Sequence, residues 1–209
     1  MSAPTAAIHI VNLALDLLKQ DIGTSIDTPS LPQEVIAVRW YDAVRRSTLR
    51  IHPWNFATTR TTLARSSTDP AFGYEDAFNL PNNYIRLLSI GDDSIDEIRR
   101  RYEIENGQLL INNDGESLNI RYTYDCTTVI KFDPLFVEVF AHRLALKMAP
   151  KFSVSTSLKT SIAEDLKDLL PSARSVDGQE SPIKRIQVSK SINRRRGSSS
   201  NPHLIVFDD

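Results

Sequence analysis

A helical sequence pattern stops abruptly at Pro53, and an aromatic pair, Trp54 and Phe56, follows it at once. Proline cannot donate a helical N–H, and it disfavours the α conformation of the preceding residue, here His52. Trp54 and Phe56 are two positions apart, so both rings face the same side of an extended chain. This stretch therefore predicts a helix that enters a β-rich module through a packed aromatic corner.

Two amphipathic helices are predicted before the corner. In the first helix, apolar residues recur every three or four positions, and Gly23 is a natural stop. Its apolar stripe consists of Ile8, Val11, Leu15, Leu18 and Ile22. The second helix is expected to begin with Ser30 as N-cap, Pro32 in its first turn and Gln33 at the capping-box position. It should extend to about residue 51, with an inner face made of Ile36, Trp40, Ala43, Ser47 and Ile51.

Antiparallel strands are favoured after the corner. The first should run from Phe56 to about Leu63, and a later one from Tyr84 to Ile90. Asn106-Gly107 is a preferred two-residue hairpin turn, because both positions tolerate positive φ. Apolar residues then alternate with polar ones, which predicts an antiparallel meander with one buried face. The alternating residues are Leu118, Ile120, Tyr122 and Tyr124.

Two more helices are predicted towards the C-terminus. Asp133 should cap the first and Pro134 should occupy its first position, ahead of the apolar row Phe136, Phe140, Leu144 and Met148. The second should run from about Thr156 to Leu170 and end at Pro171. The order of elements predicts an α+β fold, a bundle of about four helices with an inserted antiparallel β-meander module.

This order divides the chain into four parts. Residues 1–55 hold the N-terminal helices of the bundle, and 56–130 form the inserted β-rich module. Residues 131–171 return to the same bundle, and 172–209 are expected to be a flexible basic C-terminal arm.

The arm has the composition of a docking segment. It carries six basic residues and no acidic one between Ser181 and Leu204, and it ends in an apolar peptide followed by two aspartates. A solvated tail is the alternative, but an exposed apolar strand is prone to aggregate, so docking on a partner is favoured. The predicted partner-binding residues are Arg194, Arg195, Arg196, Leu204, Ile205, Val206 and Phe207.

Arginines crowd the second helix, where Asp42 is expected to pair with Arg46. The sequence leaves open whether these arginines are solvated, meet an acidic subunit or line a DNA channel. The candidates for intersubunit or lumen contacts are Arg39, Arg46 and Arg50.

Composition and the lack of known motifs exclude several classes of function. The net charge of −1 gives no overall attraction to nucleic acid or membrane, and the single cysteine, Cys126, permits no intrachain disulfide and is expected to be buried. No apolar run reaches the length of a membrane span, and a signal-peptide pattern is missing, so assembly in the cytoplasm is expected. No nucleotide-binding, metalloprotease or nucleophile-elbow motif occurs, so no catalytic, cofactor or metal residue is predicted.

A family resemblance adds a role to this fold. It is carried by the run Ala43–Ala57, by Arg60 and Leu63, by Phe72-Gly-Tyr74, and by the run from Phe78 to Leu88. These segments resemble the tail tubular protein A family, the head-to-tail adaptors of short-tailed phages, over roughly residues 5–150. The resemblance implies a non-enzymatic virion protein, a homo-dodecameric ring that joins the portal protein to the tail nozzle protein, with genomic DNA passing through its lumen.

Two other functions are kept as alternatives. A DNA-binding module that uses the arginine helix and the arm predicts strongly salt-dependent binding by the isolated chain. A polysaccharide or peptidoglycan hydrolase predicts turnover that depends on one carboxylate of a pair. The glutamates available for such a pair are Glu97, Glu103, Glu105 and Glu116.

Overall fold

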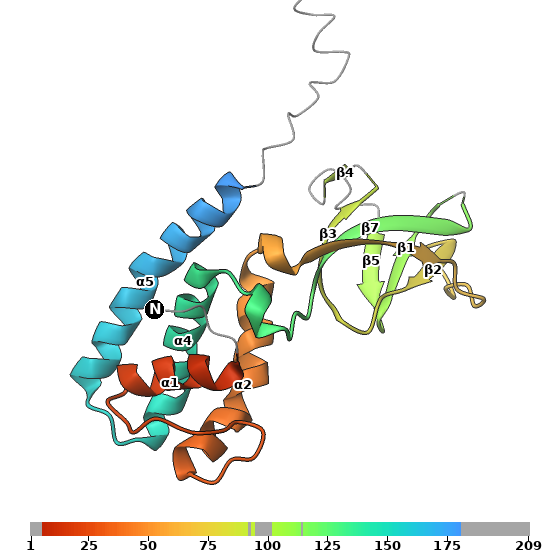
Figure 1. Ribbon diagram of the computed structural model, residues 1–209. Helices are drawn as coiled ribbons and strands as arrows, with labels where there is room; N and C mark the ends of the chain where they lie inside the picture. The colour runs from red at the N-terminus through yellow and green to blue at the C-terminus, as the bar shows by residue number, and fades with distance from the viewer. Residues whose placement is uncertain (1–5, 92, 95–101, 114, 181–209) are drawn as a thin grey trace, which may run out of the picture.

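The chain is an α+β protein with a helical end and a β-sheet end (Figure 1). The structure, a computed structural model, describes residues 6–91, 93–94, 102–113 and 115–180. Four α-helices lie in these residues, and all the described strands fall between the second and third of those helices. The predicted α+β class, with a helical bundle and an inserted antiparallel β-module, is confirmed. The helices are α1 (Ala7–Leu17), α2 (Pro32–Ile51), α4 (Pro134–Met148) and α5 (Thr156–Gln179).

Helix α4 is the centre of the bundle, because α1, α2 and α5 all pack against it. Asp133 caps it as predicted, since its Oδ1 accepts the N–H groups of Leu135 at 2.8 Å and Phe136 at 3.2 Å. Every member of its predicted apolar row is fully buried, namely Phe136, Phe140, Leu144 and Met148.

The aromatic corner forms at the end of α2, as the proline predicts. Trp54 is fully buried, and its Nε1 donates to the carbonyl oxygen of Thr48 at 3.0 Å. The ring centroids of Trp54 and Phe56 lie 5.1 and 4.8 Å from that of Phe136. The chain makes a 3-10 turn over Asn55–Ala57 instead of an extended strand, yet both rings reach the same partner on α4.

The buried face of α2 differs from the prediction. Each of four expected positions is exposed or half-buried, and the next residue along is buried instead. The buried residues are Ala37, Tyr41, Val44 and Thr48, in place of Ile36, Trp40, Ala43 and Ser47. Both sides of α2 carry apolar residues, so long-range packing decides the orientation: the Tyr41 ring lies 5.0 Å from the Phe140 ring, measured between centroids.

The N-terminal cap of α2 also differs from the prediction. Leu31, not Ser30, is the N-cap, and Glu34, not Gln33, is the capping carboxylate. Glu34 is fully buried and accepts the backbone N–H groups of Leu31 at 2.9 Å and Ser30 at 2.7 Å. It also accepts those of Thr24 and Ser25, so one carboxylate orders the whole loop between α1 and α2.

Gly23 has a role other than the predicted helix stop. Helix α1 ends at Leu17, and Ile22 is 60% exposed, so the apolar stripe is shorter than expected. The Asn12 side chain accepts the N–H of Gly23 at 2.8 Å and donates to its carbonyl at 3.1 Å. A Cβ at Gly23 would lie 2.9 Å from Cγ of Glu34, so glycine permits this close approach.

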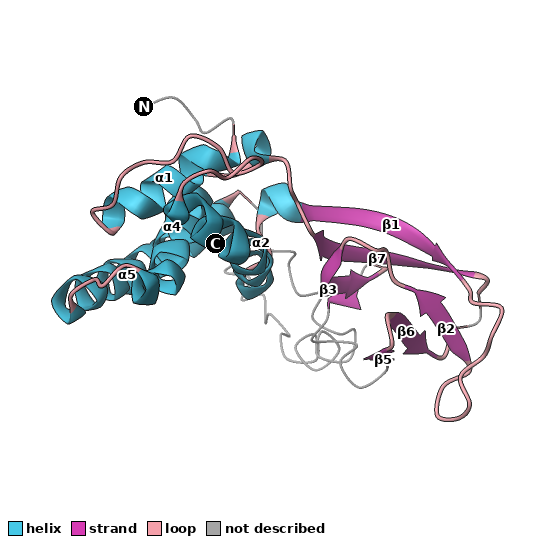
Figure 2. Cartoon of the chain, turned by 90° about the horizontal axis from the view of Figure 1, so that it is seen from below, coloured by secondary structure: helices cyan, strands magenta, loops and turns pink. Residues whose placement is uncertain are grey.

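The β-module consists of two antiparallel sheets (Figure 2). One has the strand order β1-β7-β3-β4, and the other β2-β6-β5. The order is not that of a consecutive meander, because β7 lies between β1 and β3. The first sheet holds β1 (Thr58–Ala64), β3 (Tyr84–Ile90), β4 (Asp93–Ser94) and β7 (Ser117–Tyr124); the second holds β2 (Asp76–Asn79), β5 (Tyr102–Glu105) and β6 (Gln108–Ile111).

Several local predictions in the module are confirmed. Asn106 and Gly107 have φ values of 44° and 74° and connect β5 to β6. Strand β3 has the predicted bounds, and β7 buries Leu118, Ile120 and Tyr122 on one face. These side chains form a second hydrophobic core between the sheets, separate from the bundle core, with Leu63, Phe78, Leu87, Ile90, Leu109 and Ile111.

Helix α5 passes through Pro171, where it was expected to end, and continues to Gln179. Residues 172–179 therefore belong to the bundle and not to the arm. The extension packs on the corner: Ala173 is fully buried, and Asp177 accepts the backbone N–H of Asn55 at 3.0 Å. Such contacts offset the hydrogen bond that proline removes from a helix.

Candidate functional site

Three arginines of α2 were predicted to contact a neighbouring subunit or DNA, and two of them make contacts within the chain. Arg46 pairs with Asp125 through Nη1 and Oδ2 at 3.1 Å, not with Asp42 as expected. Arg50 donates from Nη1 to the carbonyl oxygen of Ile85 in β3. Arg39 is exposed on the bundle surface. Arg46 and Arg50 therefore connect the bundle to the β-module, and their contact with a neighbour or with DNA stays a prediction.

Sequence reasoning missed the central residue of this connection, Arg45. Its side chain is only 8% exposed, and its Nη2 lies 3.0 Å from Oδ1 of Asp125. Its Nη1 lies 2.7 Å from Oδ1 of Asp42. The ion pair joins residues 80 positions apart, and no local pattern marks such a partner. Arg45 is thus a structural cation that fixes the β-module against α2.

A histidine–aspartate pair lies on the other side of the corner. Nε2 of His52 is 2.8 Å from Oδ2 of Asp177, and the Asn55 amide donates to the Asp177 carbonyl oxygen. A hollow of about 300 Å³ beside the pair has no serine or cysteine among its described lining residues. The nearby Thr58 hydroxyl donates to the Trp54 carbonyl at 2.9 Å. This pair serves to attach α5 to the corner.

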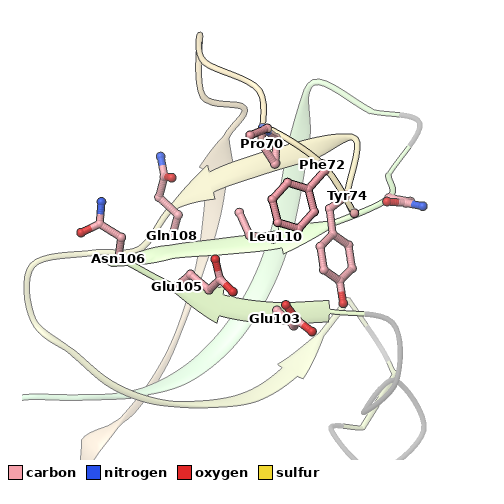
Figure 3. Close-up of a pocket in the computed structure, with 11 residues that line it drawn as sticks. Pro70, Phe72, Tyr74, Glu103, Glu105, Asn106, Gln108 and Leu110 are labelled. Atoms are coloured by element: carbon pink, nitrogen blue, oxygen red, sulfur yellow. The ribbon is translucent and has the colours of Figure 1, made fainter.

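A depression lies at the far end of the β-module, where the loop before β2 faces the β5–β6 hairpin (Figure 3). It encloses about 830 Å³. Phe72 is 88% exposed, and Gly73, with a φ of 85°, turns the loop. Burial, and then the charge and hydrogen bond of Glu103, raise the pKa of Tyr74. This groove combines an exposed aromatic ring with two carboxylates, those of Glu103 and Glu105.

The structure brings together only part of the glutamate set proposed for a hydrolase. Glu103 and Glu105 are two apart on β5, so they share one face of the strand. Glu116 is exposed ahead of β7 and does not line the groove, and Glu97 lies outside the described residues. The groove itself was missed, because its two walls come from segments about thirty residues apart, which sequence spacing does not relate.

The predicted docking arm lies outside the described residues. This applies to all seven of its candidate residues, Arg194, Arg195, Arg196, Leu204, Ile205, Val206 and Phe207. Their contact with the portal or with a neighbouring subunit stays a prediction.

Cys126 is 1% exposed, as predicted, and its sulfur lies 3.5 Å from the hydroxyl of Tyr124. Within the described residues, no group of three or more histidine, cysteine, aspartate or glutamate side chains is placed to hold a metal ion. In the same part of the chain, none of the helices has the length and apolarity that crossing a membrane requires.

No protein-family model matches the chain, and no curated protein is significantly similar to it.

Proposed function

We propose that the chain is a structural virion subunit, a head-to-tail adaptor that links the portal to the tail nozzle of a short-tailed phage. The sequence resemblance around Pro53 suggests this role. The observation that carries it is the two-ended architecture, in which a bundle and a β-module with separate cores are held together at α2. A part that joins two different partners needs two distinct surfaces with a fixed geometry between them.

The fixed geometry comes from the contacts at the end of α2. Arg45 and Arg46 both bind Asp125, and Arg50 binds the Ile85 carbonyl. Four elements thereby meet at one corner, since α5 is attached there through Asp177. Assembly then proceeds by packing of rigid subunits, without bond chemistry.

The bundle offers a surface for ring formation. Val35 and Val38 of α2 are 46% and 41% exposed and lie one turn apart beside Arg39. A head-to-tail contact repeated around an axis closes into a ring, here proposed as a homo-dodecamer. The β-module would face the nozzle protein, the C-terminal arm the portal, and genomic DNA would pass through the lumen. Assembly would take place in the host cytoplasm.

Electron microscopy tests this proposal directly. The purified chain is imaged alone and after mixing with portal rings of the same phage. Closed rings, or an added layer with the portal's symmetry, are the expected result. A chain that stays monomeric and leaves the portal rings bare overturns the adaptor role.

The arm has its own test within this proposal. A chain lacking residues 189–209 should keep the thermal unfolding profile of the full chain and lose portal binding. The matched control replaces only Arg194, Arg195 and Arg196 by glutamine, which separates basic from apolar docking. Portal binding that survives the deletion contradicts the docking-arm assignment.

The groove favours a second candidate, a polysaccharide-processing tail component. Carbohydrate sites combine aromatic faces with paired carboxylates, as Phe72 and the glutamates of β5 do here. The test is release of reducing sugar from peptidoglycan and capsular polysaccharide by the chain and by Glu103→Gln and Glu105→Gln. Turnover lost in one variant supports this candidate, and no turnover by the unaltered chain rules it out for those substrates.

A further inference from the structure

Two arginines face each other across the first sheet. In the antiparallel pairing of β1 with β7, Arg60 is the register partner of Arg121. Directly opposite residues place their Cβ atoms about 4.5–5.5 Å apart, on the same face of the sheet. That face is turned away from the β core, because the neighbouring positions Leu118, Ile120 and Tyr122 are the buried ones. Like charges in this arrangement destabilise the sheet unless an anion lies between them.

Among the described residues, no carboxylate forms an ion pair with either of these two arginines. The ion pairs within the described part of the chain involve Arg45, Arg46, Arg65 and His52, and neither Arg60 nor Arg121 takes part in one. Nε of Arg121 is buried and has no hydrogen-bond partner there. The two guanidinium groups therefore lie on the same face of the sheet and have N–H donors available for a ligand.

A hollow of about 380 Å³ opens on this face beside the pair. Its described lining contains no acidic residue and consists of Arg60, Thr61, Thr62, Gly91, Asn119, Ile120 and Arg121. The Thr62 hydroxyl donates to Oδ1 of Asn119 at 2.6 Å. That bond occupies the amide oxygen and leaves the NH₂ of Asn119 as a neutral donor next to the arginines. The hollow therefore offers donors of both kinds, charged and neutral, to an anion.

The opposite side of the arginine pair is less suited to an anion. The second hollow that Arg60 and Arg121 line also contains the Asp177 carboxylate. That carboxylate is already bound to the Asn55 N–H and to His52. Repulsion from Asp177 would push an anion towards the Thr62 and Asn119 side.

We propose that this face of the sheet is a phosphate-binding site, in which Arg60 and Arg121 hold one phosphate group and Asn119 donates to it. The guanidinium fork matches phosphate geometry, and two forks on one phosphate give charge-assisted hydrogen bonds from both sides. The phosphate belongs either to a free polyphosphate compound or to a nucleic-acid backbone. The site goes beyond the adaptor role, because it needs only the folded β-module.

The experiment uses the full chain, Arg60→Gln and a matched control, Lys167→Gln, which removes an exposed positive charge from α5. Binding of tripolyphosphate and of a short oligothymidylate is measured at low salt. Arg60→Gln should weaken tripolyphosphate binding about tenfold or more, and Lys167→Gln by less than about twofold. If oligothymidylate binding falls in parallel, the site accepts a phosphodiester backbone. If only tripolyphosphate binding falls, the ligand is a free phosphate compound.

Thermal unfolding in the absence of phosphate is a second measurement. Here Arg60→Gln should increase the measured stability, whereas it should decrease phosphate binding. Removing one of two repelling charges should raise the unfolding temperature of Arg60→Gln by about 1 °C, whereas loss of a structural arginine would lower it. Tripolyphosphate should then stabilise the unaltered chain and not the variant. Equal weakening of binding in Arg60→Gln and Lys167→Gln, or a lower unfolding temperature for Arg60→Gln alone, overturns the proposal.

Discussion

Arg45 of α2 and Asp125, the residue after β7, form an ion pair with 3.0 Å between Nη2 and Oδ1. Only 8% of the Arg45 side chain and 12% of the Asp125 side chain are exposed. The two residues belong to different ends of the molecule, so the orientation of the β-module depends on a charge pair shielded from water. Arg46 binds the other oxygen of the same carboxylate from a more exposed position, where 52% of its side chain is accessible.

Asp125→Asn should lower the free energy of unfolding by about 2–3 kcal/mol, because Arg45 then keeps only the exposed Asp42 as a charged partner. Arg46→Gln is the matched control and should cost less than about 1 kcal/mol, since exposed pairs contribute little. Urea unfolding at neutral pH measures both. Equal losses in the two variants would show that burial of Arg45 is unimportant.

Glu34→Gln should lower the unfolding temperature by several degrees. The amide replaces one carboxylate oxygen by an NH₂ group, which cannot accept any of the backbone N–H groups that Glu34 now binds. The loop between α1 and α2 should then exchange its amide hydrogens faster. Gln33→Glu is the control, because Gln33 was the expected capping residue. Unchanged loop exchange in Glu34→Gln contradicts this account.

The same residue predicts a pH dependence. Backbone N–H groups, that of Leu31 first, hold the pKa of Glu34 well below its ordinary value of 4.5. A depressed carboxyl pKa stabilises the fold above the unfolded-state pKa, and this contribution is lost as the pH falls towards the folded-state pKa. The stability difference between the unaltered chain and Glu34→Gln should therefore shrink as the pH falls from 7 to about 3. Urea midpoints across this range measure it, and a constant difference would argue against an ionised Glu34.

Asp177→Ala should release the last turns of α5 from the corner. The variant loses the bonds to the Asn55 N–H and to His52, at a cost of about 1–3 kcal/mol. Hydrogen exchange of residues 172–179 should accelerate, while the control Asp168→Ala, on the exposed side of α5, leaves it unchanged. If these residues keep their protection, the helix beyond Pro171 is stabilised by something other than Asp177.

Tyr41→Phe should be neutral or stabilising, by up to about 1 kcal/mol, because the Tyr41 hydroxyl is buried without a hydrogen-bond partner in the described residues. Burial raises the pKa of Tyr41 to about 12. A raised phenol pKa stabilises the fold below the unfolded value of 10.0, and this contribution is lost as the pH rises towards 12. The variant should therefore lose less stability between neutral pH and about pH 11 in thermal unfolding. A clear destabilisation at neutral pH would mean that the hydroxyl is bonded.

The sequence predicted best those features that depend on a residue's own backbone. Pro53, Asn106-Gly107 and Asp133-Pro134 act through φ restriction, positive φ and capping, all of which are local. Their positions in the structure agree with prediction. Three local signals did not hold. Tertiary contacts carry α5 past Pro171, α1 ends before Gly23, and Leu31 replaces Ser30 as the N-cap of α2.

Long-range relationships could not be predicted in the same way. Asp177 binds Asn55 across 122 positions, and Arg45 binds Asp125 across 80. No periodicity encodes a partner at such a distance. The inner face of α2 was misplaced for a related reason, since Val35 and Val38 give its exposed side an apolar pattern too. The arginine pair of β1 and β7 likewise becomes visible only once the register is known.

The β-module enters and leaves the chain at adjacent points, because Thr58 at its start and Thr123 near its end are register partners. Opposite residues of an antiparallel pair lie only about 4.5–5.5 Å apart between Cα atoms. A short peptide can therefore bridge the cut ends if residues 58–123 are excised, without pulling α2 and α4 apart. The β-module is thus an insertion that recombination could replace by another domain whose ends lie equally close together. The fold of the helical bundle would be unchanged by such a replacement.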